Sequence, residues 1–216
     1  MAAPGVGGIA SIVSVLMLFG PRVELATAAE SPAIELRLGA RGGLDDAALQ
    51  RIEQTVGALL APAGIGANWH GCQPPGDCSS EHPVIVLVQL LTVSKMTDGE
   101  VCGEFLRDQR SGVPTVLVYL PRVVELQQAM RGGSGARDSP ALATTQIGDL
   151  VGLIIAHEVG HALGVPHGRT GVMKARPSVD DVIALRLSTL AFQQKEATVM
   201  RLAIIARSEA LLAQVR

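Results

Sequence analysis

Hydrophobic and polar positions change their period early in the chain, which predicts a strand followed by a helix. Ile34, Leu36 and Leu38 alternate with polar residues, as in a β-strand with one buried face. After a pair of glycines, apolar residues recur at the three- and four-residue spacing of an amphipathic α-helix. This apolar stripe consists of Leu49, Ile52, Val56, Leu59 and Leu60. Gly64 follows where such a helix would end, and glycine is common at that position.

Three segments in the middle of the chain have features of strands. Residues 84–91 and 115–120 are continuous apolar runs, and the first is typical of a strand that is covered on both faces. Residues 101–106 form a weaker run between them. Because this segment is bounded by Gly99 and Gly112, it is either a strand or an ordinary loop.

A strongly apolar stretch in the second half of the chain predicts a buried helix. Residues 131–140 hold glycine, serine and charged residues, which favours a flexible loop, and a helix is expected from about Ala141. Gly148 and Gly152 leave room for another element to approach this helix closely. Its apolar residues, which cover most of its faces, are Ile147, Leu150, Val151, Ile154 and Ile155.

Two further helices are expected towards the C-terminus. Ser178 and Asp181 have the spacing of a capping box, in which each side chain hydrogen-bonds the backbone of the other residue. Asp180 and Asp181 also suit the positive end of a helix, so we interpret them as structural carboxylates and not as calcium ligands. The apolar residues of this helix are Ile183, Leu187 and Leu190. A last helix over 196–216, with Leu202, Ile205 and Leu212, either packs on the domain or mediates association.

The composition excludes several classes of function. With 216 residues, of which 48% are hydrophobic, the chain can bury the core of one domain of ordinary size. Its formal net charge of -2 gives no electrostatic basis for binding nucleic acid. Only 2% of the residues are aromatic, so the core is expected to be aliphatic and to offer no stacking surface for bases or sugars.

The predicted buried helix carries a metal-ligand pattern near its end. His157 and His161 are four residues apart, so both imidazoles project from the same helical face and can bind one ion. Glu158 lies beside them, in the position of a general base rather than of a ligand. Gly164 ends the helix, and the chain turns back to present His167. Three neutral imidazoles with a fourth position open to water are typical of a catalytic zinc site.

Together these residues form the pattern HExxHxxGxxH, and residues 154–177 resemble the metzincin clan of zinc endopeptidases, most nearly its matrixin-like branch. Met173 stands where the clan has the methionine of its Met-turn, a tight turn that runs beneath the zinc. No tyrosine follows Met173, which argues against the astacin-like and serralysin-like branches. Gly168, directly after the third histidine, matches none of the residues typical of a branch.

The resemblance implies an α/β fold of the α+β zincin-like kind. In this fold a mixed twisted sheet packs on two long helices, and the active-site helix is followed by the Met-turn and a C-terminal helix. Residues 101–106 would then be the antiparallel edge strand that borders the cleft, to which an extended peptide can add as a further strand. The implied ligands of Zn²⁺ are His157, His161 and His167. The implied function is hydrolysis of peptide bonds in a protein or peptide substrate by a metal-activated water, with Glu158 as the catalytic general base.

The first residues of the chain are typical of an export signal. Residues 9–19 form an apolar run too short to span a bilayer, and residues 26–28 are small, as a signal peptidase requires. No Lys or Arg precedes the run, so a retained membrane anchor or a misassigned start codon is the alternative. We expect a secreted or periplasmic protein with no membrane span in its mature form. Its predicted parts are a signal peptide (1–28), a catalytic domain (29–195) and a C-terminal helical tail (196–216).

The three cysteines fit an exported protein. Cys72 and Cys78 enclose a Pro-Pro-Gly turn, so a disulfide between them is expected. Cys102 is then either a small buried hydrophobic residue or a thiolate on the edge strand that holds the enzyme latent. His70 and His82 flank the Cys72–Cys78 loop, and we interpret them as surface residues because no carboxylate stands at ligand spacing for a second ion.

Two other classes of function remain as alternatives. One is a non-catalytic metal-binding or adhesion module on a metzincin scaffold, although a purely structural zinc has no need of a general base such as Glu158. The other is a hydrolase that acts on an amide other than a peptide bond. Tyr119, the one tyrosine of the chain, lies in a predicted strand and is not expected to assist the hydrolysis.

Overall fold

The computed structural model describes residues 31–71, 84–93, 101–107, 113–132 and 140–214, which belong to one compact unit. The predicted signal peptide, both members of the expected Cys72–Cys78 disulfide and His82 lie outside these ranges, so they stay predictions. The predicted domain boundaries stay predictions as well. Within the described ranges, every helix is too short or too polar to cross a membrane.

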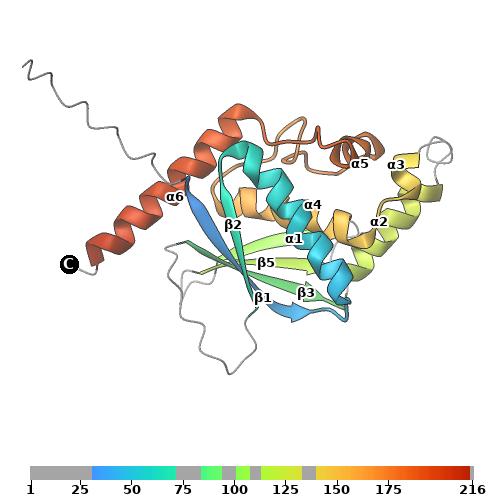
Figure 1. Cartoon of the computed structure of the whole chain (residues 1–216), viewed down its shortest axis with the longest axis horizontal. Helices are drawn as coiled ribbons and strands as arrows, with labels where there is room; N and C mark the ends of the chain where they lie inside the picture. The colour runs from blue at the N-terminus through green and yellow to red at the C-terminus, as the bar shows by residue number, and fades with distance from the viewer. Residues whose placement is uncertain (1–30, 72–83, 94–100, 108–112, 133–139, 215–216) are drawn as a thin grey trace, which may run out of the picture. The chain divides into compact units, whose positions relative to one another are not determined.

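Five strands of the described chain form one mixed sheet (Figure 1). In chain order they are β1 (Ala33–Arg41), β2 (Gly66–Gly71), β3 (Ile85–Leu91), β4 (Gly103–Arg107) and β5 (Pro114–Tyr119). They lie in the order β2-β1-β3-β5-β4, with β4 antiparallel to β5 and all other neighbours parallel. The segment at 101–106 is therefore an antiparallel edge strand and not a loop, as the resemblance implied.

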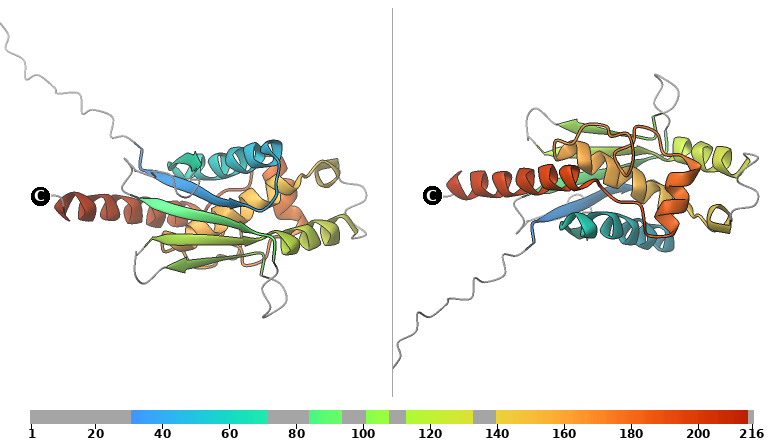
Figure 2. Two further views of the ribbon diagram at one scale, coloured as in Figure 1. Left: turned by 90° about the horizontal axis from the view of Figure 1, so that it is seen from below. Right: turned by 90° about the horizontal axis from the view of Figure 1, so that it is seen from above.

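Two long helices pack against each other and against one face of this sheet. They are α1 (Asp46–Leu60) and α4 (Ile147–Ala162), which lie side by side in Figures 1 and 2. The predicted fold class, a mixed α/β sheet packed on two long helices, is confirmed. The expectation that residues 84–91 are covered on both faces is wrong. Because both helices lie on one side, burial in β3 alternates, and only Val86, Val88 and Leu90 are fully buried.

The helix α4 is buried on almost all sides, as its apolar sequence predicted. All but two of its 16 residues are buried. The two glycines permit close packing on α1, since a Cβ at Gly148 would lie 2.8 Å from the carbonyl oxygen of Ala48. A Cβ at Gly152 would lie 2.6 Å from Thr55 Cβ. A well-fixed helix of this kind gives its side chains a defined position.

The start of α4 differs from the sequence prediction. The helix expected from about Ala141 is broken, because the short α3 (Pro140–Ala143) precedes it and α4 begins only at Ile147. Gln146 and Asp149 form a capping box at this point. Such a box satisfies the first backbone N–H groups of a helix and so fixes where it begins.

The remaining helices surround these two layers. They are α2 (Leu120–Gly132), α5 (Val179–Arg186), α6 (Gln194–Gln214) and the 3-10 turn η1 (Ala61–Ala63), which ends at the predicted cap Gly64. The expected continuation of α5 through Leu187 and Leu190 is wrong, since Ser188 has a φ of 56° and the chain turns there. The helix α6 packs on the domain through Ala197, Met200 and Ile204, whereas Leu202, Ile205 and Leu212 are exposed.

Candidate metal centre

Three histidines converge at the end of α4. One ring nitrogen each from His157, His161 and His167 lies within 4.8 Å of the other two, and the described residues hold no other group of three such ligands. His157 Nε2 and His161 Nε2 are 3.1 Å apart. Two nitrogens on a tetrahedral zinc with bonds of about 2.0–2.1 Å lie roughly 3.3 Å apart. Gly164, with a φ of 90°, ends the helix and lets the chain return with His167.

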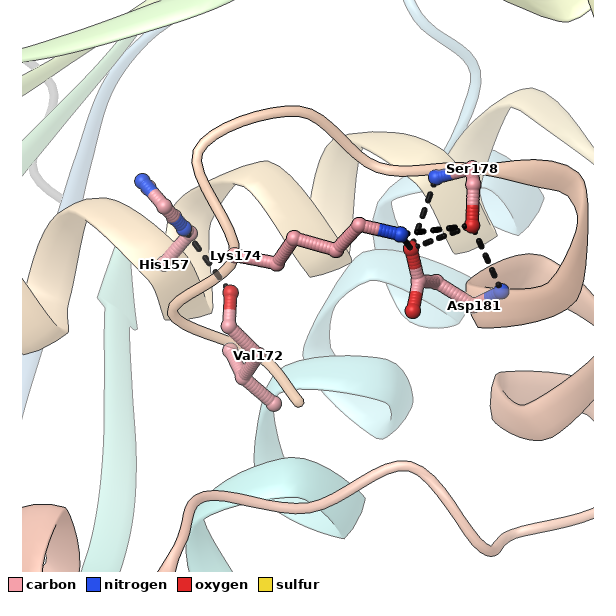
Figure 3. Close-up of polar contacts among 5 residues, drawn as sticks. All are labelled: His157, Val172, Lys174, Ser178 and Asp181. Carbon is pink, nitrogen blue, oxygen red and sulfur yellow. Dashed lines mark hydrogen bonds and ion pairs between the residues drawn. The ribbon is translucent and has the colours of Figure 1, made fainter. Parts of the chain in front are cut away.

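Two backbone carbonyl groups fix the orientation of the first two rings. His157 Nδ1 lies 2.8 Å from the carbonyl oxygen of Val172 (Figure 3), and His161 Nδ1 lies 2.7 Å from that of Val165. A carbonyl oxygen can only accept, so each Nδ1 carries the hydrogen and each Nε2 keeps a free lone pair. Metal-ligating histidines are commonly held in this way, so the donor set fits zinc.

The environment keeps both of these rings neutral. Burial lowers the pKa of His157 to about 4. The hydrogen bond to Val172 acts in the opposite direction and raises this pKa, whereas the charges of His161 and His167 lower it further. Burial also lowers the pKa of His161, again against a backbone hydrogen bond. Because neutral imidazole is the form that binds a metal, these shifts favour the ligand role.

Glu158 is buried next to the ligands, with 6% of its surface exposed. Burial, and then the negative charge of Glu104, raise its pKa to about 7. A bound dication would draw this pKa down again. The edge strand β4 approaches the carboxylate at Gly103, where a Cβ would lie 3.2 Å from Glu158 Oε1 and 2.5 Å from Ile154 Cγ2. The candidate general base therefore lies beside the strand expected to border the cleft.

Met173 packs against α4 at the residue before His161. Its side chain is fully buried, and a Cβ at Gly160 would lie 2.3 Å from its sulfur atom. A side chain at this position of the helix would thus displace the end of the methionine side chain. Met173 therefore packs against the helix that carries His157 and His161, and its assignment to a Met-turn stays a prediction.

Lys174, directly after Met173, ties the turn to the start of α5 (Figure 3). Its Nζ donates to Asp181 Oδ2 at 2.8 Å and to Ser178 Oγ at 2.9 Å. The predicted capping box between Ser178 and Asp181 is present, so Asp181 has the structural role that we expected. Burial raises the pKa of Asp181, but its hydrogen bonds to Lys174 and Ser178 outweigh burial, and the net pKa lies below the usual value.

Asp181→Asn is expected to lower the free energy of unfolding at neutral pH and to leave it unchanged in strong acid. The folded pKa lies below the unfolded value of about 3.9, so the ionised carboxylate stabilises the fold above that value. This contribution is lost as the pH falls through the folded pKa. Denaturant titrations of both proteins across the acid range measure it. Asp180→Asn is the control, because Asp180 is exposed and forms no ion pair with the described residues. If stability depended on pH in the same way in both variants, the stabilising role assigned to the Asp181 carboxylate would be wrong.

The other residues considered from the sequence do not belong to the group of three histidines. Cys102 is half-buried before β4, and burial raises the pKa of its thiol while Arg122 opposes this effect. The structure thus favours the buried hydrophobic interpretation of Cys102 over the thiolate. Tyr119 donates a hydrogen bond to Glu104, and its pKa rises to about 12 through burial and that bond. His70 is exposed on β2, as expected of a surface residue.

The roles of two residues of this region were not predicted from the sequence. Gly168 matched none of the residues typical of a branch. Its close contact with α6 accounts for a glycine at this position, because a Cβ at Gly168 would lie 2.7 Å from Glu196 Oε1. Glu196 is 4% exposed. The sequence held one indication of a role for Glu196, which is that it stands three residues after Gln193, the residue that caps α6. A glutamate at this spacing can accept a hydrogen bond from the backbone N–H of the capping residue, as Glu196 does here.

No protein-family model and no curated protein matches this chain. Among solved structures, it is similar to archaemetzincin from Methanopyrus kandleri, at 14% sequence identity and a TM-score of 0.47. The similarity covers 84% of this chain and 99% of that chain. Likeness at this level does not place the chain in the family of that protein.

Proposed function

We propose that this chain is a zinc-dependent endopeptidase. The observation that carries the proposal is the convergence of three histidines, two of them held neutral with Nε2 free, beside the buried carboxylate of Glu158. The described residues would supply three ligands to a zinc ion, and catalytic zinc sites combine three protein ligands with one position open to water or substrate.

The chain's own residues divide the chemistry between them. When bound, zinc lowers the pKa of a coordinated water from about 15.7 towards 7 and polarises the substrate carbonyl. His157, His161 and His167 hold the ion through ring nitrogens. Glu158 accepts a proton from the attacking water and donates it to the leaving amine of the cleaved peptide.

The edge strand supports a peptide as the substrate class. β4 pairs with β5 on one side, and no described strand pairs with its other side. Because Gly103 lies against Glu158, an extended chain added to β4 would run past the carboxylate. Main-chain pairing holds an extended peptide without selecting its side chains.

The finer assignments belong to the same proposal. We assign the chain to the matrixin-like branch of the metzincin clan, because Lys174 and Ala175 follow Met173, where the astacin-like and serralysin-like branches have a tyrosine. Export after removal of the signal peptide, and a disulfide between Cys72 and Cys78, complete it. Mass mapping of the exported protein would find these two thiols joined to each other.

Cleavage of a mixed peptide library by the purified protein, read by mass spectrometry, tests the function. We expect fragments whose formation stops with a chelator and resumes with zinc, and their new ends would report the side-chain preference. A protein that holds zinc and cuts no peptide would favour the non-catalytic module. If the protein hydrolysed small amides and no peptide, it would be a hydrolase that acts on an amide other than a peptide bond.

A further inference from the structure

The residues that lead into α6 lie along the loop that follows His167. Val172 N donates to the carbonyl oxygen of Ala191 at 3.3 Å, and Gln193 Nε2 donates to Thr170 Oγ1 at 2.9 Å. The same loop supplies the Val172 carbonyl that orients His157. The beginning of α6 therefore contacts a segment on which two of the three ligands depend.

Glu196 places a buried carboxyl group at this contact. One carboxylate oxygen, Oε2, accepts a hydrogen bond from Gln193 N at 2.7 Å, which fixes the side chain at the start of the helix. The other oxygen, Oε1, faces Gly168, where even a Cβ atom would lie 2.7 Å from it. Gly168 N in turn donates to the carbonyl oxygen of Met173 at 2.7 Å. The carboxylate thus lies directly against the residue after His167.

His167 depends on this support more than the other two ligands do. Its ring is exposed and makes no hydrogen bond with any residue in the described ranges. The rings of His157 and His161, by contrast, each bond a backbone carbonyl. The position of the third ligand is therefore set by the backbone of its own loop, and Glu196 packs against that loop at Gly168.

The same helix also contacts the segment that carries the second ligand. Arg207 Nη2 donates to the carbonyl oxygen of Ala162 at 2.6 Å. Ala162 follows His161 in the last turn of α4, where carbonyl groups have no partner within the helix and a positive charge is favourable. Arg207 thus holds the end of α4 in the place where the chain turns towards His167.

We propose that Glu196 and Arg207 are positioning residues of the metal centre, so that α6 sets the zinc affinity without supplying a ligand. This inference rests on the proposed zinc site. Removal of a residue that holds metal ligands in place typically weakens metal binding by roughly 10- to 100-fold. We expect a loss in this range for Glu196→Ala and a smaller loss for Arg207→Ala. Glu196→Gln keeps the volume and the acceptor for Gln193 N, so it should restore most of the affinity.

Equilibrium competition for zinc between the purified protein and a chromogenic chelator measures the effect, with the melting temperature of each zinc-free variant recorded in parallel. Arg201→Ala is the matched control. Arg201 also lies on α6 and donates to a backbone carbonyl, that of Ala63 at 2.5 Å, but this bond holds the end of η1 and no ligand segment. We expect Arg201→Ala to lower the melting temperature and to leave the zinc dissociation constant unchanged.

Two results would overturn the inference and leave the zinc site standing. One is an unchanged zinc affinity in Glu196→Ala and Arg207→Ala, whatever the loss in melting temperature. The other is an equal loss of affinity in Arg201→Ala. If the wild type bound no zinc, the proposed site itself would fail and this inference with it. If Glu196→Ala does not fold, Gly168→Ala tests the same contact, because its added methyl group would press on Glu196 Oε1. An unchanged zinc affinity in Gly168→Ala would also overturn the inference.

Discussion

Glu158→Gln is expected to retain the zinc of the wild type while the rate of peptide cleavage falls by a factor on the order of a hundred or more. The residue is not a ligand, so its loss leaves the three imidazoles in place. Glutamine has nearly the same volume, which matters because Glu158 is 6% exposed and β4 packs against it at Gly103. The amide cannot accept the proton of the attacking water, so the loss of rate isolates the proton transfer.

The measurement combines kcat/KM on a peptide taken from the cleaved library with metal analysis of the same sample. Glu53→Gln, at an exposed position of α1, controls for removal of one negative charge. We expect no change in rate or zinc content for that variant. Cleavage by Glu158→Gln at the wild-type rate would show that another group takes the proton, and the mechanism proposed for Glu158 would be wrong.

His161→Ala is expected to remove zinc and activity together. The wild type should carry about one zinc per chain, because the described residues contain one group of three ligands. With His161 gone, two imidazoles cannot retain the ion through gel filtration, and cleavage falls to background. His70→Ala is the control, since His70 is exposed on β2 outside this group. Retention of a full zinc by His161→Ala, or loss of zinc from His70→Ala, would place the metal elsewhere.

Much of the site could be predicted because its ligands stand close together in the sequence. The spacing of His157 and His161 fixes their common face on any α-helix, and Gly164 determines where the chain can turn. The edge strand β4 could be predicted only from the resemblance, because its own residues are compatible with either a strand or a loop. Glu104 could not have been anticipated as a neighbour of Glu158, because their electrostatic contact depends on how β4 lies beside α4.

The parts of the fold that were not predicted from the sequence have local and tertiary causes. β2 was not predicted, because the sequence of Gly66–Gly71 lacks an alternation of apolar residues and the strand is specified mainly by its pairing with β1. The break before Ile147 was missed because apolar periodicity does not reveal a capping box formed by glutamine. The contact between Gly168 and Glu196 joins residues far apart in sequence, and no pattern within either segment indicates it.

The burial of α4 also decides how the chain behaves before it folds. In the folded protein, all but two residues of this helix are covered by other elements. In an unfolded chain the same stretch is exposed, and residues 150–156 present seven consecutive positions without a charge. Uncharged apolar segments of this length associate between chains when they are exposed. We therefore expect aggregation of this segment, which directly precedes His157, to lower the yield on refolding as the protein concentration rises.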